Sequence, residues 1–436
     1  MRLETVKTFI LSILIGISLL LTFALWSYRP EMGNLTEDVV EDSTDLGGTE
    51  ETMERLVEPG SIVFRNDGHY FGFADPTDQQ SLYSDMQSWV MYNFRTTDSN
   101  GPPSEAYQVE FIFPDTIPMN MAGALFTFNE DVEWPDWGFE RLFITFNQDT
   151  NALNVIFLSE DGEQQATAIV NNSEKYDRLW DDLTAYEGLT EFLEVEAADD
   201  PFYIPADEVD VATKSIAVQT IDSGAMVDIM FTNPDIVTRS QVSENEIYFT
   251  DSARGIMRVY PNRRTMEFQN PLQSSYAQME PEALLTQSMT HINDHRGWTD
   301  DYHLRDIDVN AETNTVRYQL FYDGYPVFGS NYSTIIEQQY RAEELHQYNR
   351  PLYSLENYLG EDDSTTLRSG SQVLEYLDSS STYDLADLEG IKIGYDLNYR
   401  SSADAITLEP AWFMNDNGSW QKIDFSAFDK AEERGD

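Results

Sequence analysis

Residues 391–399 read Ile391-Lys-Ile-Gly-Tyr-Asp-Leu-Asn-Tyr399, with an apolar or aromatic side chain at every second position. Such an alternation is typical of a β-strand with one buried face. Two further apolar runs follow, at 405–414 and 420–425, and Asn415-Asp-Asn-Gly418 separates them. Asn-Gly readily adopts the positive φ angles of a tight hairpin turn. The C-terminal block therefore predicts strands in an antiparallel sheet.

Moving outward from this block, we expect an α+β domain over residues 273–436. A helix should begin at Pro281, because proline is well suited to the first turn of a helix, and end near Gly297. Strands mixed with segregated helices define the α+β class. The other predicted strands are 303–309, 315–322, 331–338 and 344–348, followed by a short helix over 371–377.

An N-terminal α+β domain is expected over residues 59–198. Thr77 should open its first helix, with Gln80 as the partner in a capping box, and Ser173 should cap a second helix that runs to about Leu183. Turn-forming residues separate the apolar runs between these helices. The predicted strands are 61–65, 70–73, 141–146, 151–158 and 164–170.

Between these two regions, residues 199–272 predict a central, mostly-β domain. Its apolar runs are short, and glycine, asparagine and proline punctuate them. No long helical period appears. The predicted strands are 214–221, 226–231, 246–250 and 265–268.

An uncharged apolar run, residues 9–26, indicates a transmembrane anchor. At about 1.5 Å per residue, a helix of this length is roughly 27 Å long and can cross a bilayer core. Arg2 and Lys7 lie in the leader, residues 1–8, and the positive-inside rule then places the N-terminus in the cytoplasm. A cleaved signal peptide is the rival interpretation, but no small-x-small cleavage site follows the run. We therefore expect a single-pass cell-membrane protein with most of its chain extracellular.

One face of the predicted anchor carries Thr8, Ser12 and Gly16, which recur every four residues. Small and hydroxylated residues allow two membrane helices to approach closely and to form hydrogen bonds across the contact. The alternative is that these residues occur in the anchor by chance. They form the sharpest partner-binding hypothesis that the sequence offers.

Residues 27–58 follow the anchor and predict a solvated, acidic stalk. Asp and Glu far outnumber the basic residues there, and large apolar residues are few. Like charges repel and extend such a segment. A short helix near Met53–Val57 is the one element expected within it.

The whole chain is strongly acidic, with 26 Lys+Arg against 78 Asp+Glu and a formal net charge of −52. A field of this sign repels phosphate backbones, so we expect no nucleic-acid partner. The acids are spread along the chain, which favours a solvated surface over a cation store. The absence of cysteine excludes disulfides, thiolate metal sites and cysteine nucleophiles.

Motifs of known enzyme classes are absent, including nucleophile elbows, Walker loops and zinc-binding H-E-x-x-H. The strongest candidate for chemistry is the run from His291 to His303, which holds His295, Asp300 and Asp301. Two histidines four apart on a helix could share a metal ion with a carboxylate. The alternative is an ordinary helix C-terminus followed by an aspartate-rich turn. We assign no catalytic residue, no cofactor and no metal ligand, and we expect no enzyme.

Four passages resemble the YycH family of membrane-anchored accessory proteins from low-GC Gram-positive bacteria. The first is the basic leader and anchor, and the second is LVEPGSIVFRNDGHYFGF at 56–73. The third is FQNPLQ at 268–273 together with HINDHRGWTDDYHL at 291–304. The fourth comprises YPVFGS at 325–330, YNRPLYSL at 348–355, IKIGYDL at 391–397 and LEPAWFMNDNGSW at 408–420. This last block is also similar to the terminal domain of the companion protein YycI.

The resemblance implies a non-enzymatic regulator of a YycG/WalK-type sensor histidine kinase, in an essential two-component system for the cell wall. It would act with a YycI-like protein, through contacts in the membrane and between extracytoplasmic domains. Thr8, Ser12 and Gly16 would then be the positions to test for helix packing. Two alternatives stay open: a module that binds cell-wall glycan or another ligand, and, less favoured, a hydrolase that acts on the wall.

Overall fold

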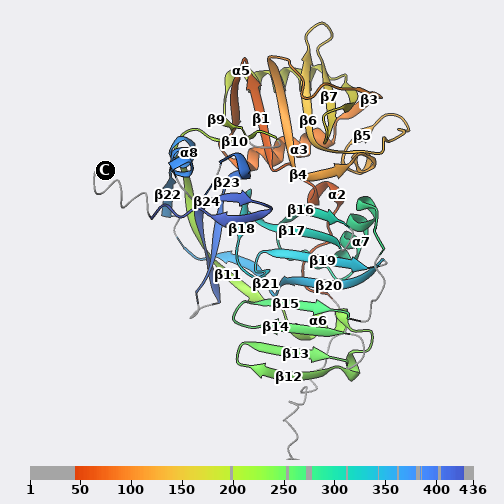
Figure 1. Ribbon diagram of the computed structural model, residues 1–436, viewed down its shortest axis with the longest axis vertical. Coiled ribbons are helices and arrows are strands. Elements are labelled where there is room, and N and C mark those ends of the chain that lie inside the picture. Colours follow the sequence, from red (N-terminus) through yellow and green to blue (C-terminus); the bar gives the residue numbers. More distant parts are fainter. Residues whose placement is uncertain are drawn as a thin grey trace, which may run out of the picture.

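The computed structural model describes residues 45–426 except 197–199, 252–254, 272–276, 311–312, 342, 361–362, 380–382, 384 and 401–403. Two lobes, each built on its own sheet, make up this part of the chain (Figure 1). Helices are few and short beside the strands, so the fold is a sheet-rich α+β fold. This confirms the α+β part of the predicted fold class.

The N-terminal lobe contains a ten-stranded sheet in the order β10-β9-β2-β1-β4-β6-β7-β8-β3-β5. Nearly all its neighbouring strands are antiparallel, and phenylalanines such as Phe111, Phe113 and Phe139 are buried against it. Its strands are β1 (Ser61–Asn66), β2 (His69–Phe73), β3 (Val90–Asp98), β4 (Tyr107–Pro118), β5 (Thr127–Phe128), β6 (Gly138–Asn147), β7 (Ala152–Ser159), β8 (Gln164–Val170), β9 (Leu189–Val195) and β10 (Phe202–Pro205).

Helices α3 (Pro76–Gln87), α4 (Ala122–Leu125) and α5 (Ser173–Ala185) accompany this sheet. The predicted caps are displaced to the preceding residues. Asp75 caps α3 by accepting a hydrogen bond from the Thr77 amide, and Asn172 caps α5. Asp and Asn at these positions accept the free amide hydrogens of the first turn.

The C-terminal lobe contains a fifteen-stranded sheet whose main path runs β12-β13-β14-β15-β20-β19-β17-β18-β23-β24-β11-β21. Its strands are β11 (Val209–Thr220), β12 (Thr238–Ser243), β13 (Glu246–Thr250), β14 (Ile256–Tyr260), β15 (Thr265–Gln269), β16 (Tyr302–Val309), β17 (Asn314–Tyr322), β18 (Tyr325–Phe328), β19 (Ile335–Arg341), β20 (Glu344–Pro351), β21 (Tyr353–Tyr358), β22 (Asp363–Leu367), β23 (Leu388–Arg400), β24 (Ala405–Asp416) and β25 (Ser419–Lys422). The helices are α6 (Ser223–Met230), α7 (Pro281–Asn293) and α8 (Gly370–Ser379).

The C-terminal hairpins have the structure that the alternation predicts. Ile391, Ile393 and Tyr395 are buried on one face of β23, which pairs with β24 along its length. Asn417 and Gly418 both have positive φ and connect β24 to β25. The local sequence thus determines both which face of β23 is buried and where the turn between β24 and β25 lies.

The three predicted domains become two sheets in the structure. Residues 202–205 form β10 of the first sheet, whereas β11 to β15 belong to the same sheet as the C-terminal strands. β15 pairs with β20, and β11 lies between β24 and β21. These long-range strand pairings, which local periodicity does not encode, remove the boundary expected at residue 272.

The segment Met226–Phe231, predicted as a strand, is helical: α6 occupies Ser223–Met230. Its short apolar run fits either element, because helix and strand patterns cannot be distinguished over so few residues. Met226 and Val227 are buried side by side in the core, which a helix turn permits.

The predicted acidic stalk is also corrected in part. Residues 45–58 pack on both lobes, and helix α2 (Met53–Leu56) buries Met53 and Leu56. The rest of the predicted stalk, together with the leader and the anchor, lies outside the described residues. Within residues 45–426, as far as they are described, no helix is long and apolar enough to cross a membrane.

Candidate functional site: a strap and the cleft between the lobes

Residues 45–58, here called the strap, run from the C-terminal lobe to the N-terminal lobe (Figure 1). At its first end the Leu46 amide donates to the His295 carbonyl at 3.0 Å, and the Thr49 amide donates to the Trp298 carbonyl at 2.9 Å. Thr49 and Trp298 form an antiparallel bridge. The strap therefore extends the C-terminal lobe by a short stretch of strand-like pairing.

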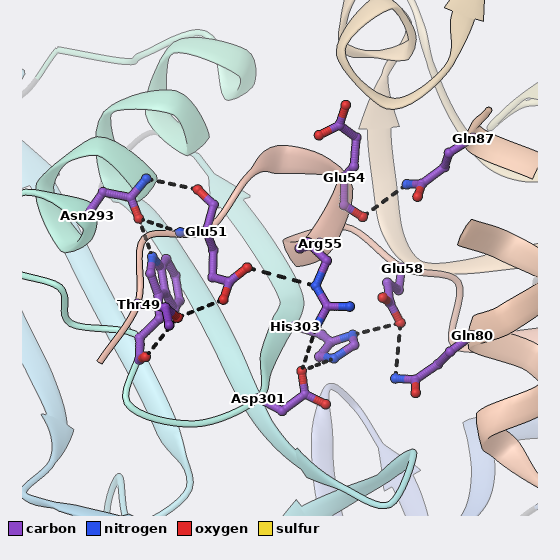
Figure 2. Close-up of polar contacts among 11 residues, drawn as sticks. Thr49, Glu51, Glu54, Arg55, Glu58, Gln80, Gln87, Asn293, Asp301 and His303 are labelled. Atoms are coloured by element: carbon purple, nitrogen blue, oxygen red, sulfur yellow. Dashed lines mark hydrogen bonds and ion pairs between the residues drawn. The ribbon is translucent and has the colours of Figure 1, made fainter. Parts of the chain in front are cut away.

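A side chain strengthens this first end. Asn293, the last residue of α7, accepts a hydrogen bond from the Glu51 amide and donates one to the Glu51 carbonyl, both at 2.9 Å (Figure 2). Its Oδ1 also accepts from the Trp298 indole at 2.7 Å. One amide side chain thus fixes the strap and the buried indole together.

The second end of the strap is held by the N-terminal lobe. The Tyr83 hydroxyl donates to the Val57 carbonyl at 3.0 Å, and the Gln87 amide donates to the Glu54 carbonyl at 3.0 Å. Tyr83 and Gln87 both belong to α3. Leu56 and Val57 are fully buried there, so the strap also contributes apolar area to the core.

A buried histidine connects the strap to the C-terminal lobe at this second end. His303 on β16 places Nδ1 3.2 Å from Glu58 Oε2 and Nε2 3.0 Å from Asp301 Oδ1 (Figure 2). Both ring nitrogens face carboxylates, which requires both to carry protons, so His303 is an imidazolium. Burial lowers its pKa, but the two carboxylates outweigh burial and raise the pKa to about 9.

The other two histidines of the predicted cluster have a different role. Gln338 donates to His291 Nδ1 at 2.8 Å, and His295 Nε2 lies 3.1 Å from the Tyr348 hydroxyl. Burial lowers the pKa of His291 to about 4 and that of His295 to about 3, so both are neutral at pH 7. The structure brings their rings to within 5.3 Å, centre to centre, whereas His303 faces Glu58 and Asp301. Among the described residues, no three metal-ligating side chains converge.

A cleft of about 1090 Å³ lies between the two lobes. Ile112 and Phe113 line it from the N-terminal lobe, and Phe321 and Tyr325 line it from the C-terminal lobe. Glu58 also lines the cleft. The strap therefore borders the cleft at the group of charged residues formed by Glu58, His303 and Asp301, here called the charged junction. Clefts at domain interfaces are common places for ligands to bind, and this one has the size of such sites.

Buried charges surround the N-terminal side of the cleft. Arg141 Nε lies 2.8 Å from Glu110 Oε1, and its Nη1 lies 3.1 Å from Asp200 Oδ1. Glu140 also lines the cleft, and burial, followed by the charge of Asp200, raises its pKa to about 7. A carboxyl with a raised pKa can act as an acid or as a hydrogen-bond donor to a ligand.

The predicted partner-binding residues Thr8, Ser12 and Gly16 lie outside the described residues. The sequence does not predict the Glu58–His303 pair, because its members lie far apart in the chain and Glu58 belongs to the predicted acidic stalk. Met53, Leu56 and Val57 follow helical spacing, and this was the one local sign that the segment is buried.

A two-lobed, sheet-rich α+β protein with a strap across an interlobe cleft is the class that these observations define. Residues 4–188 match the family described as YycH protein, N-terminal domain, and residues 199–430 match YycH protein, C-terminal domain. The chain belongs to the YycH family.

Known proteins agree with this assignment. A Bacillus subtilis (strain 168) protein described as "Two-component system WalR/WalK regulatory protein YycH" is 25% identical over 444 residues, which cover 96% of each chain. The crystal structure of YycH from Bacillus subtilis superimposes with a TM-score of 0.70 at 21% identity, over 87% of this chain and 99% of that one. The structural match supports the same fold.

Proposed function

We propose that this chain is a membrane-anchored, extracytoplasmic and non-enzymatic regulator of a WalK-type sensor histidine kinase, acting with a YycI-like partner. The observation that carries the proposal is the match to the YycH family along nearly the whole chain, together with a relative described as a regulatory protein. The sequence-predicted anchor at residues 9–26 supplies the membrane location in this proposal.

The strap supports a physical route for such regulation. It is the described segment nearest to the predicted anchor, and both lobes hold it. A force or displacement at the anchor would therefore reach the interface between the lobes. A regulator changes a kinase equilibrium only if it binds two kinase states with unequal affinity. A difference of a few kcal/mol is sufficient for a large change in population.

A hydrolase acting on the cell wall is less well supported. An enzyme that cleaves the glycosidic bonds of the wall would need two carboxyl groups that flank the scissile bond. Glu140 has the raised pKa of an acid, but the neighbouring Asp200 is bound by Arg141. The cleft as a ligand site fits a regulator equally well, so we retain the regulatory function.

The test is co-purification of the sensor kinase with the full-length chain from membranes. A Ser12→Leu/Gly16→Leu variant alters the proposed helix face, and Ser18→Leu is its control because residue 18 falls on the opposite side of the predicted helix. A soluble form should begin at Asp45, because the strap packs on both lobes. We expect the kinase with the intact chain and the control, and its loss from the double variant and the soluble form.

The other outcomes separate the parts of the proposal. If the soluble form retains the kinase fully, the lobes make the contact and the role of Thr8, Ser12 and Gly16 is wrong. If the kinase accompanies none of the forms, the regulatory function itself is overturned.

A further inference from the structure

The C-terminal wall of the cleft holds a lysine against Trp420, whose ring centre lies 5.6 Å from that of Phe328. Lys392 lies on β23, and Trp420 of β25 and Phe328 of β18 line the same cleft. The Lys392 Nζ lies 4.1 Å from the centre of the Trp420 ring. An ammonium this close to an indole face is attracted by the electrons of the ring.

The sequence Gly390-Ile-Lys-Ile-Gly394 explains how this arrangement is built. Ile391 and Ile393 point into the core, which directs Lys392 to the opposite face. A side chain at Gly390 would lie 3.3 Å from the Trp420 ring, and one at Gly394 would lie 2.7 Å from the Phe328 ring. The two glycines therefore leave room for the two rings on the face of β23 that carries the lysine.

The charge of Lys392 is not balanced by the protein. Among the described residues, no carboxylate lies within ion-pairing distance of its Nζ, although acids outnumber bases threefold in the chain, 78 to 26. Glu389, another residue lining the cleft, is bound by the Asn415 side chain and by the Gly418 amide, both at 2.9 Å. Burial and the nearby Arg305 lower the pKa of Lys392 to about 8. A partly buried cation kept without a counterion is suited to receive an anion from outside.

A second unsatisfied group lies on the same face of the sheet as the lysine. Asn415 is paired with Gly390 and Trp420 in neighbouring strands, so its side chain is on the lysine's face of the sheet. Its Nδ2 donates to Glu389, which identifies Oδ1 as the free acceptor, and this buried oxygen has no hydrogen-bond partner. A buried acceptor without a partner costs free energy that a ligand N–H can recover.

We propose that the cleft binds the carboxylate of a short peptide, with Lys392 as the ionic partner and Asn415 Oδ1 as the acceptor for the adjacent amide N–H. Peptides carry a carboxylate and an N–H donor close together, which is what the two unsatisfied groups require. Trp420 and Phe328 supply the apolar contact for the peptide's side chains. The inference does not depend on the proposed function, because it concerns binding alone.

The experiment measures the affinity of the full-length protein in detergent for an acetylated alanine dipeptide by ligand-observed NMR. The same dipeptide with an amidated C-terminus tests the carboxylate, and inorganic phosphate tests a general anion site. Lys392→Met removes the charge at similar length, and Lys392→Arg retains it. Lys422→Met is the matched control, because its Nζ is already paired with Asp396 at 2.8 Å and it does not line the cleft.

We expect Lys392→Met to weaken binding of the dipeptide by about tenfold, the effect of one charge-assisted hydrogen bond. The affinities of Lys392→Arg and Lys422→Met for the dipeptide should stay within about threefold of that of the unaltered protein. The amidated dipeptide should bind weakly, and Lys392→Met should not change its affinity. Rescue by arginine distinguishes lost binding from lost folding.

Three results would overturn the proposal: no binding of the dipeptide at millimolar concentration, binding that Lys392→Met leaves unchanged, or equal competition by phosphate. None of these readouts involves the kinase, so they leave the regulatory proposal intact.

Discussion

His295 and His303 lie eight positions apart in the chain and are equally inaccessible, each with 3% of its surface exposed. One is neutral and the other is charged. His295 faces the Tyr348 hydroxyl, and burial, followed by the charge of Arg350, lowers its pKa to about 3. His303 faces Glu58 and Asp301, and its pKa is raised to about 9. Burial lowers the pKa of both histidines, and only at His303 do facing carboxylates outweigh it, so the partners decide which of the two is charged.

The difference also separates two structural roles. The neutral pocket around His291 and His295 belongs to one lobe and holds α7 against β19 and β20. The charged junction connects three segments: the strap, the loop before β16, and α3 through Gln80, which donates to Glu58 at 3.3 Å. The first is a part of a core, and the second joins the lobes.

The largest effect should come from removing one charge of the junction. Glu58→Gln leaves the His303 imidazolium buried with a single carboxylate and should lower the free energy of unfolding by roughly 3–5 kcal/mol at pH 7, as breaking buried pairs does. Chemical denaturation of the soluble form that begins at Asp45 measures this. Glu58→Gln combined with His303→Gln removes both charges and should recover part of the loss. An unaltered stability in Glu58→Gln would show that the junction is not a buried ion pair.

The next effect is a loss of stability in alkaline solution. The pKa of His303 is raised in the folded state. Its contribution to the free energy of unfolding is therefore fully present below pH 6.5 and is lost as the pH rises through about 9. The shift corresponds to roughly 3 kcal/mol. Unfolding curves measured at a series of pH values should show this decline in the unaltered chain and not in His303→Gln. Parallel curves for the two proteins would contradict the charged state of His303.

The smallest effect lies on the acid side and concerns His295. Its pKa is lowered in the folded state. Its contribution to the free energy of unfolding is therefore present above pH 6.5 and falls as the pH drops. Between pH 6.5 and pH 5 the loss should be roughly 2 kcal/mol. The comparison of the unaltered chain with His295→Gln isolates this term, because buried acids such as Asp300 affect both proteins alike. A steeper acid limb in His295→Gln would show that His295 is charged.

Elements with a strong local pattern could be predicted from the sequence. The alternation at 391–399, the Asn417-Gly418 turn and the start of α7 at Pro281 follow from the properties of neighbouring residues. The helix at 223–230 could not, because its apolar run is too short for one period to prevail. The joining of the β11–β15 strands to the C-terminal sheet depends on pairings such as Met266 with Arg350, which no local pattern records.

The candidate site shows the same limit. His303 and Asp301 lie within one run of the sequence, but their role depends on Glu58, which lies in a segment whose acidic composition predicts solvated residues. Because acidic residues are so abundant, the sequence does not distinguish the few acids that are buried and paired from the many that are solvated. From the sequence, Lys392 and Asn415 are only parts of a strand and a turn, because the role of an unpaired lysine depends on the residues that surround it in space.

The position of β11 has a consequence for how the chain acquires its structure during synthesis. The N-terminal lobe finds all its strand partners between residues 61 and 205, so it can fold as soon as that length has emerged. Strand β11 follows immediately, but its partner β24 pairs Leu408 with Lys214, nearly two hundred residues later. Contacts of such separation form slowly, and strand edges exposed in the interval are prone to misassociation. A chaperone that shields extended segments would therefore be needed most while residues 209–404 await their last strands.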